Sequence, residues 1–143
     1  RYRVFMDFII QNIWLVLLVL ISGFMLLGAG GLFGKLSGIK QIGPQEAVLL
    51  FNHEDALVID VREQSEWADG HIGKAKHIPL GQLKNKLAEL EKFKDKPIVA
   101  VCRSGLRSGS ACSTLKKAGF EKLYNLAGGM IAWDQAGLPR ERK

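Results

Sequence analysis

The chain has 143 residues, of which 48 % are hydrophobic and 24 % are charged, and its net charge is +6. This length suits one globular domain with an appendage, and the small positive surplus, with lysines mixed among acids, disfavours a nucleic-acid-binding stripe. It favours a solvated face or weak attraction to anionic lipid. The only two cysteines, Cys102 and Cys112, exclude a disulfide-stapled secreted domain and, lacking a CxxC pair, a cysteine metal site.

The N-terminal segment is the apolar part of the chain. Residues 8–34 carry no charged side chain, and at about 1.5 Å per residue the run from 13 to 33 is long enough to cross a hydrocarbon core of about 30 Å. We therefore expect an anchor over residues 1–37, with a single transmembrane span at about 13–33, followed by a globular domain over residues 38–143. A secretory signal, cleaved near Gly28-Ala29-Gly30, is the alternative.

From residue 39 onward, apolar runs that are typical of strands alternate with helical patterns. Pro44 stands at a favoured first helical position, and the leucines of residues 80–90 have helical spacing. Strands are predicted at 39–42, 56–61, 77–78, 98–101 and 123–126, and helices at 44–51, 63–68, 80–90, 107–118 and 130–135. This alternation predicts an α/β domain with a parallel sheet, whose ligands bind where the strands reach their carboxyl ends.

Cys102 stands at such a strand end. A tight loop with Gly105 and two arginines follows it, and the predicted helix from Arg107 opens directly after the loop. Loop amides and the amino end of a helix stabilise an anion, and positive charge from Arg103 and Arg107 favours a nucleophilic thiolate. A lone cysteine is more often a small buried hydrophobe. The glycine and the arginine at 107 favour the functional interpretation.

The other cysteine and the three histidines are less informative. Cys112 falls on the inward face of the predicted helix, which favours a core residue over a resolving thiol. His53 lies in a polar turn and His77 in a predicted strand. His71 follows a glycine and precedes a buried isoleucine, which favours a structural hydrogen-bonding role. A thiolate stabilised by loop dipoles does not need a histidine base.

Three charged residues are expected at the same rim of the sheet as the cysteine. Asp60 ends its strand, Arg62 follows, and Glu66 stands four residues beyond the arginine, where it could pair with it. The favoured interpretation is a local ion-pair network that shapes the rim. A substrate contact by Arg62 is the alternative.

These residues together carry a family resemblance. The segment Cys102-Arg103-Ser104-Gly105-Leu106-Arg107-Ser108 resembles the active-site loop of rhodanese-type sulfurtransferases. Further segments are similar to the same family: Val58-Ile59-Asp60-Val61-Arg62, Glu66-Trp67, Gly70-His71-Ile72, Ile78-Pro79, Ala118-Gly119-Phe120, Tyr124-Asn125-Leu126, Gly128-Gly129 and Ala132-Trp133. The resemblance covers about residues 40–140. It implies a three-layer α/β domain with a central, mostly parallel five-stranded sheet, here preceded by one transmembrane helix, as in membrane-anchored rhodanese-like proteins of bacteria.

The resemblance also implies a reaction. Cys102 would take sulfane sulfur from thiosulfate or a persulfide, hold it as a persulfide and pass it to a thiophilic acceptor. Residues 103–107 (Arg103, Ser104, Gly105, Leu106 and Arg107) would bind the persulfide, and the two arginines would attract the anionic donor. Asp60, Arg62, Glu66 and His71 would support the rim. Neither a metal nor an organic cofactor is implied. The implied partners are small sulfur anions or protein persulfides and the membrane, with room for a membrane-protein partner, and without nucleic acid.

Two other functions compete with sulfur transfer. Rhodanese-like phosphatases and arsenate reductases resemble Cys-x5-Arg, whereas Cys102 to Arg107 here is Cys-x4-Arg, a smaller cradle that suits sulfur better than phosphate. The second alternative is a non-enzymatic adaptor of a membrane complex that uses a rhodanese fold. The intact cysteine with both arginines favours chemistry.

The location of the domain is decided by redox chemistry. The positive-inside rule gives a tie, because Arg1 and Arg3 flank one end of the apolar run and Lys35 and Lys40 the other. A catalytic thiol with no resolving partner works best in a reducing compartment. We therefore expect a single-pass protein of the inner (plasma) membrane, with its catalytic domain on the cytoplasmic side.

Overall fold

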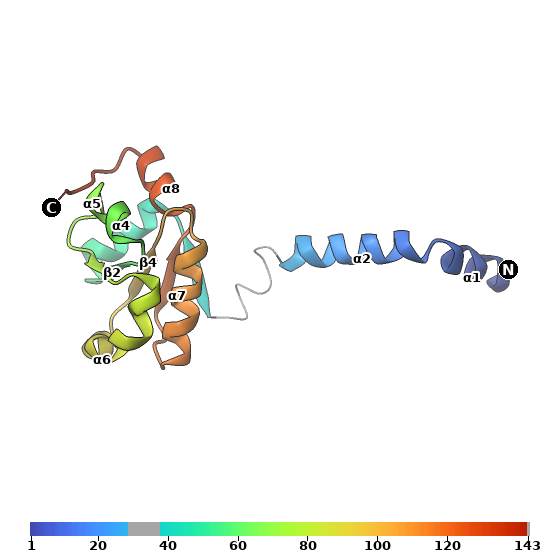
Figure 1. Ribbon diagram of the computed structural model, residues 1–143, viewed down its shortest axis with the longest axis horizontal. Helices are drawn as coiled ribbons and strands as arrows, with labels where there is room; N and C mark the ends of the chain where they lie inside the picture. The colour runs from blue at the N-terminus through green and yellow to red at the C-terminus, as the bar shows by residue number, and fades with distance from the viewer. Residues whose placement is uncertain (29–37, 143) are drawn as a thin grey trace. The chain divides into compact units, whose positions relative to one another are not determined.

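The computed structural model describes residues 1–28 and 38–142. The chain divides into two compact units, Arg1–Ser37 and Gly38–Lys143 (Figure 1). The first unit contains helices and the second contains the sheet with its covering helices.

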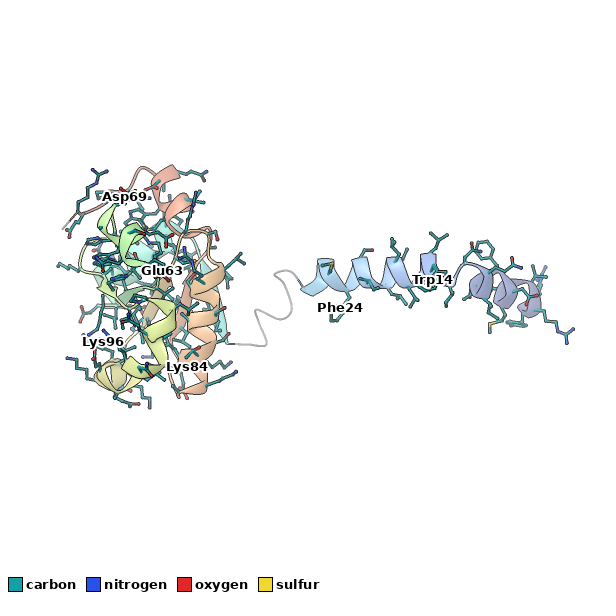
Figure 2. The ribbon with its side chains drawn as sticks, in the orientation of Figure 1. Trp14, Phe24, Glu63, Asp69, Lys84 and Lys96 are labelled. Atoms are coloured by element: carbon teal, nitrogen blue, oxygen red, sulfur yellow. The ribbon has the colours of Figure 1, made fainter. Side chains whose placement is uncertain are left out.

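The first unit contains two helices, α1 (Tyr2–Gln11) and α2 (Ile13–Gly28). Asn12 separates them: its side-chain Nδ2 donates to the Phe8 carbonyl oxygen at 2.8 Å, and its backbone N–H also turns back to the last carbonyls of α1. A side chain that competes for backbone groups in this way favours a break. The helices around it are bent by 75°. Along α2, apolar side chains such as Trp14 and Phe24 are exposed (Figure 2).

The expected uninterrupted span at residues 13–33 is not supported. Within residues 1–28 and 38–142, no single helix combines the length and the apolar character needed to cross a membrane. The bent pair of α1 and α2 satisfies both conditions jointly, by length and composition. The described helix α2 begins after Asn12 and has 16 residues, fewer than the roughly 20 that cross a hydrocarbon core of about 30 Å. The part of the expected span beyond Gly28 lies outside the described residues.

The second unit is built on one sheet. Its strands are β1 (Ile39–Ile42), β2 (Leu57–Asp60), β3 (Lys76–His77), β4 (Ile98–Val101) and β5 (Leu123–Leu126). Their order across the sheet is β1-β5-β4-β2-β3, and every neighbouring pair is parallel. The five-stranded parallel sheet predicted for this α/β domain is thereby confirmed. The central strand β4 is buried along its whole length, as a parallel strand covered on both faces requires.

Helices cover both faces of the sheet (Figure 1). They are α4 (Pro44–His53), α5 (Gln64–Ala68), α6 (Leu87–Leu90), α7 (Leu106–Lys117) and α8 (Gly129–Gln135), with 3-10 helices η1 (Leu80–Lys86) and η2 (Glu91–Phe93). Alternate residues of β4 enter two separate cores. Ile98 and Ala100 pack with residues of α7, while Val99 and Val101 pack with Met130 of α8.

The segment 80–90 differs from the single helix that its leucines predict. It begins as the 3-10 helix η1 and becomes α-helical only at Leu87. Gly81 weakens the α-helix locally, and residues three apart share a face in both helix types. Leu80 and Leu83 therefore contact the core in either form.

Candidate active site

Cys102 lies at the carboxyl end of the central strand, where the predicted site was placed. The loop after it leads directly into α7, and Gly105 caps that helix with φ +101°. A Cβ at this position would lie 3.3 Å from the backbone nitrogen of Gly128. Two features therefore require a glycine at this position: the left-handed backbone conformation and the close approach of the β5–α8 turn.

The Cys102 sulfur accepts hydrogen bonds from the residues that follow it. The backbone N–H of Gly105 donates to Sγ at 3.0 Å, and the Ser108 hydroxyl lies 3.3 Å from it. Burial by itself raises the pKa of this thiol. The Ser108 hydroxyl and the loop amides outweigh burial, so the pKa of Cys102 lies below its ordinary value. The site therefore favours a thiolate at neutral pH more than an ordinary cysteine does.

A buried polar network reaches the sulfur from the neighbouring strands β5 and β1. Asn125 of β5 donates from Nδ2 to the Gly105 carbonyl at 3.0 Å and to Oε1 of Gln41 on β1 at 2.9 Å. Its Oδ1 lies 2.5 Å from the Ser108 hydroxyl. The sequence placed Ser108 at the end of the segment that resembles the rhodanese active-site loop and did not assign Asn125 or Gln41 to the site. A polar residue within the apolar strand β5 was the available signal.

The start of α8 packs directly on the cysteine loop. The N–H of Met130 donates to the Cys102 carbonyl at 2.8 Å, and that of Ile131 to the Arg103 carbonyl at 3.1 Å. Gly129 has φ +52°, and a Cβ on it would lie 2.3 Å from the Cys102 carbonyl oxygen. Gly129 at the start of α8 thus allows two backbones to meet, which holds the loop between α7 and α8.

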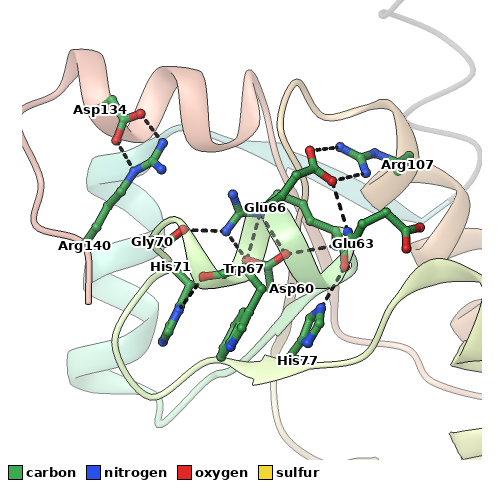
Figure 3. A network of polar contacts seen from close by, with 11 residues as sticks. Asp60, Glu63, Glu66, Trp67, Gly70, His71, His77, Arg107, Asp134 and Arg140 are labelled. Atoms are coloured by element: carbon green, nitrogen blue, oxygen red, sulfur yellow. Dashed lines mark hydrogen bonds and ion pairs between the residues drawn. The ribbon is translucent and has the colours of Figure 1, made fainter. Parts of the chain in front are cut away.

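The partner of Glu66 is Arg107, and the expected pairing with Arg62 is wrong. Arg107 forms a two-pronged ion pair with Glu66, with both N–O distances 2.7 Å (Figure 3). The bond to Arg107 lowers the pKa of Glu66 to about 2, although desolvation opposes the change. The tertiary fold brings α5 beside the first turn of α7. Glu66 therefore pairs with Arg107, which is remote in sequence, and not with Arg62, which is four residues away. Arg107 thus ties the end of the cysteine loop to α5, and Glu66 compensates the charge of Arg107.

Asp60 and Arg62 form a closed pair at the base of the rim. Arg62 donates to both carboxylate oxygens of Asp60, the shortest bond being 2.8 Å, and also to the Gly70 carbonyl at 2.7 Å. Both side chains are almost completely buried. Such a pair fixes the path of the chain from β2 to Gly70 and leaves little of Arg62 free for a ligand.

Trp67 joins the two histidines of the rim. Its ring stacks on His71 at 3.5 Å between centroids and on His77 at 4.7 Å. His71 Nδ1 lies 3.1 Å from the Trp67 carbonyl oxygen, and His77 Nε2 lies 2.7 Å from that of Arg62. Both rings therefore make structural contacts to backbone carbonyls (Figure 3).

The remaining loop residues face outward. Arg103, Ser104 and Leu106 are exposed, Leu106 to 81 %.

Cys112 is completely buried in the core, where desolvation raises its pKa to about 12. Among the described residues, no group of three or more histidines, cysteines and acids could hold a metal ion.

A cavity of about 370 Å³ lies beside the loop. Its lining residues come from the rim after β2, the cysteine loop, α8 and the C-terminal segment: Arg62, Glu66, Asp69, Arg103, Met130, Ile131, Asp134 and Arg140. Arg103 adjoins Cys102 in the chain, and the Met130 amide is bonded to the Cys102 carbonyl. The cavity therefore adjoins the backbone of the cysteine loop.

Comparison with known proteins agrees with this geometry. Residues 43–136 match the model of the rhodanese-like domain. The chain belongs to the rhodanese-like domain family. The chain is 37 % identical over 107 residues to the uncharacterized protein YibN of Escherichia coli. This aligned stretch covers 74 % of this chain and 75 % of that protein. It is 40 % identical over 90 residues to a sulfurtransferase of Allochromatium vinosum, covering 63 % of this chain and 82 % of the relative.

A solved structure shows the same fold. A rhodanese-related protein from Thermoplasma volcanium superposes with a TM-score of 0.65 at 28 % identity, over 73 % of this chain and 99 % of that one. At the level of the family, this rhodanese-like domain is a sulfurtransferase domain. Several of its relatives are uncharacterized, so the family assigns the reaction type and leaves the donor open.

Proposed function

We propose that this protein is a membrane-anchored sulfurtransferase that carries sulfane sulfur as a persulfide on Cys102. The observation that carries the proposal is the pair of donors on the sulfur, the Gly105 N–H and the Ser108 hydroxyl. Groups that stabilise a thiolate at this position also stabilise the outer negative charge of a persulfide formed there.

The reaction has two steps. The Cys102 thiolate attacks the outer sulfur of thiosulfate, the S–S bond of the donor breaks, and sulfite leaves with its electron pair, so that the enzyme holds Cys–S–S⁻. A thiophilic acceptor such as cyanide then attacks the outer sulfur and leaves as thiocyanate, which regenerates the thiolate. With an organic persulfide as donor, the leaving group is the corresponding thiolate. Neither step requires an external oxidant or a cofactor.

The loop supports sulfur transfer better than phosphate transfer. Its Cys-x4-Arg spacing makes a smaller cradle, and Arg107 at the end of the loop is held by both oxygens of Glu66. A phosphatase of the Cys-x5-Arg type needs that arginine for the equatorial oxygens of the phosphoryl group. Arg103, exposed beside the cysteine, remains to attract an anionic donor.

The membrane part of the proposal rests on composition. We propose that α1 and α2, with the apolar residues that follow, attach the chain to the plasma membrane and that the rhodanese-like domain works on the cytoplasmic side. Support comes from the absence of charged side chains over residues 8–34 and from the exposed apolar surface of α2. The free thiol is compatible with a reducing compartment.

Mass spectrometry of the intact protein tests the chemistry. After incubation with thiosulfate, we expect the detergent-solubilised chain to gain one sulfur atom, which cyanide removes. Cys102→Ser should not gain the sulfur, whereas Cys112→Ser should gain it like the natural chain, because its thiol is buried in the core. If no sulfane donor adds mass to Cys102, the proposal fails and the adaptor function remains.

A further inference from the structure

The cavity beside the cysteine loop is larger than an inorganic donor needs. Its volume of about 370 Å³ lies in the range of roughly 300–1,000 Å³ that proteins use for small organic ligands. Thiosulfate has five non-hydrogen atoms, and a water molecule takes about 30 Å³ of liquid volume, so such an anion leaves much of the cavity to solvent. The size therefore favours a donor with an organic part.

Two opposite charges in the cavity lack a side-chain partner. Most of the charged lining residues are compensated, in the pairs Arg62–Asp60, Glu66–Arg107 and Arg140–Asp134. Within residues 1–28 and 38–142, the side chains of Arg103 and Asp69 form no hydrogen bond or ion pair, whereas the other charged lining residues do. A ligand with a negative group at one end and a positive group at the other would compensate both.

The positive group of the ligand would face the wall that is remote from the loop. Asp69 caps the end of α5 (Figure 2), and Arg142 Nε donates to its carbonyl at 3.2 Å. Arg140 lies close to it. Its bond to Asp134 raises the pKa of Arg140, burial opposes this, and the negative charge of Asp69 raises it further. A Cβ on Gly70, the residue after Asp69, would lie 2.8 Å from Arg140 Cδ, so Asp69 and Arg140 line the cavity close to one another.

Arg140 keeps donors for a ligand. Its Nε and Nη2 donate to the carboxylate of Asp134 (Figure 3). A guanidinium carries five N–H groups, so Nη1 is not used by this pair. A group with an ammonium and a carboxylate on neighbouring atoms could place its ammonium on Asp69 and its carboxylate on Arg140.

The C-terminal segment 138–142 holds this wall in place. The backbones of His71 and Glu141 exchange two hydrogen bonds, at 2.9 and 2.8 Å, and Trp133 Nε1 donates to the Pro139 carbonyl at 3.0 Å. This segment lies beyond residues 43–136, which match the rhodanese-like model. The wall is therefore held by backbone and side-chain contacts of the C-terminal segment.

We propose that the cavity binds a low-molecular-mass persulfide that carries an α-amino acid group, with its ammonium on Asp69, its carboxylate on Arg140 and its persulfide sulfur toward Arg103. This inference rests on the proposed function and names its donor. The Cys102 thiolate attacks the outer sulfur of the donor, the donor's S–S bond breaks, and the amino acid leaves as its thiolate. One persulfide and one thiolate are present before and after the step.

Two donors that differ at the amino group, which is charged in one and acetylated in the other, test the inference. The rate of sulfur loading onto Cys102 is followed by intact mass over a range of concentrations of cysteine persulfide and of N-acetylcysteine persulfide. We expect the full chain to load about fivefold more efficiently from cysteine persulfide, because one partly exposed ion pair is lost with the other donor. Asp69→Asn should reduce this ratio to about one, through the half-saturating concentration, and Asp69→Lys should invert it. Asp95→Asn removes the same charge far from the cavity and should keep the ratio.

The outcomes separate the inference from the proposed function. Loading from thiosulfate with equal rates from the two persulfides, or a preference that survives Asp69→Asn, overturns the inference and leaves the sulfurtransferase. No loading from thiosulfate or from either persulfide overturns both. A preference for cysteine persulfide that disappears in Asp69→Asn and persists in Asp95→Asn supports the inference.

Discussion

Ser108 carries one hydroxyl proton and faces two acceptors, the Cys102 sulfur and Oδ1 of Asn125. The amide of Asn125 is fixed in orientation, because its Nδ2 donates to Gln41 and Gly105. When the cysteine is protonated, its S–H can donate to Ser108 while the hydroxyl donates to Asn125. When the cysteine ionises, the hydroxyl must turn to the sulfur. At the scale of single residues, this serine therefore decides how readily the thiolate forms.

Removal of the Ser108 hydroxyl tests this role. For Ser108→Ala we expect the midpoint of the pH profile of Cys102 alkylation to move to higher pH, and the rate at pH 7 to fall about tenfold, as the loss of one hydrogen bond to a charged group predicts. The measurement is the rate of iodoacetamide modification against pH, read by mass. Ser110→Ala, an exposed serine on the same helix, is the matched control and should retain the natural profile. An unchanged profile in Ser108→Ala would exclude the serine as a stabiliser of the thiolate.

At the scale of elements, the cysteine loop is held by backbone contacts between the start of α8 and the end of β4. Gly129 makes this contact possible, because the Cys102 and Arg103 backbones occupy the space of a Cβ. Gly137 has a similar φ, +70°, but open space around it. A side chain at Gly137 would therefore cost backbone strain alone, whereas a side chain at Gly129 would cost strain and a clash.

We expect Gly129→Ala to lower the free energy of unfolding by more than the roughly 1–2 kcal/mol that a left-handed alanine costs, and to impair sulfur loading of Cys102. Gly137→Ala should show the strain alone and keep sulfur loading. Urea denaturation of both variants and of the natural chain provides the comparison. Equal losses of stability in the two variants would show that the loop can move away from α8 at little cost.

The ion pair between Glu66 of α5 and Arg107 of α7 makes a second link between elements, and it depends on pH. The pKa of Glu66 is about 2 in the folded protein, against an ordinary value of 4.5. Above pH 4.5 the carboxylate is charged in both states and the pair stabilises fully. Between pH 4.5 and 2 the unfolded chain binds the proton first, so that stabilisation is lost as the pH falls.

The free energy of unfolding should therefore fall less steeply between pH 4.5 and 2 in Glu66→Gln than in the natural chain. Thermal unfolding at a series of pH values measures the slope. Glu121→Gln removes an exposed carboxyl outside this pair and should keep the natural slope. A slope in Glu66→Gln that equals that of the natural chain would contradict the assigned partner.

At the scale of the whole molecule, the chain combines a rhodanese-like domain with an apolar helical unit. Both α1 and α2 expose apolar side chains, including Phe5 on the first helix and Leu18 on the second. In water such a surface would drive association, so a partner of low polarity has to cover it. The plasma membrane is the partner that we propose.

Membrane fractionation tests this attachment. The full chain should sediment with membranes after an alkaline wash, and Leu17→Arg with Leu20→Arg should shift it toward the supernatant, because charges in the hydrocarbon core are costly. Gln82→Arg with Asn85→Arg adds the same charge to the exposed surface of the domain and should remain with the membrane. If the variants of both units fractionate alike, α2 does not attach the chain.

The side of the membrane requires its own experiment. Lys84 is exposed on the domain (Figure 2), so Lys84→Cys in a Cys102→Ser background offers an accessible thiol. A membrane-impermeant maleimide should label it only after lysis of the cells. Labelling of intact cells would place the domain outside the cytoplasm.

Much of the domain was predictable because its signals are local. The five strands and the position of Cys102 follow from short apolar runs, from glycines and from Pro44, which act within a few residues. The segment 80–90 and the break at Asn12 were less accessible. In segment 80–90, a 3-10 helix and an α-helix bury the same leucines, so the leucine spacing does not distinguish them. At Asn12, one polar side chain is enough to end a helix inside an apolar run.

By itself, the sequence determined the α/β alternation, the placement of the cysteine at the end of the central strand and the family of the domain. Only the tertiary structure decided which residues meet around that cysteine. Glu66 and Arg107 are 41 positions apart, and Gln41 and Asn125 are 84 apart. Such contacts depend on strand order and on the packing of helices against the sheet. Hydrophobic periodicity predicts the type of each element and does not predict either of these. The wall formed by segment 138–142 arises in the same way.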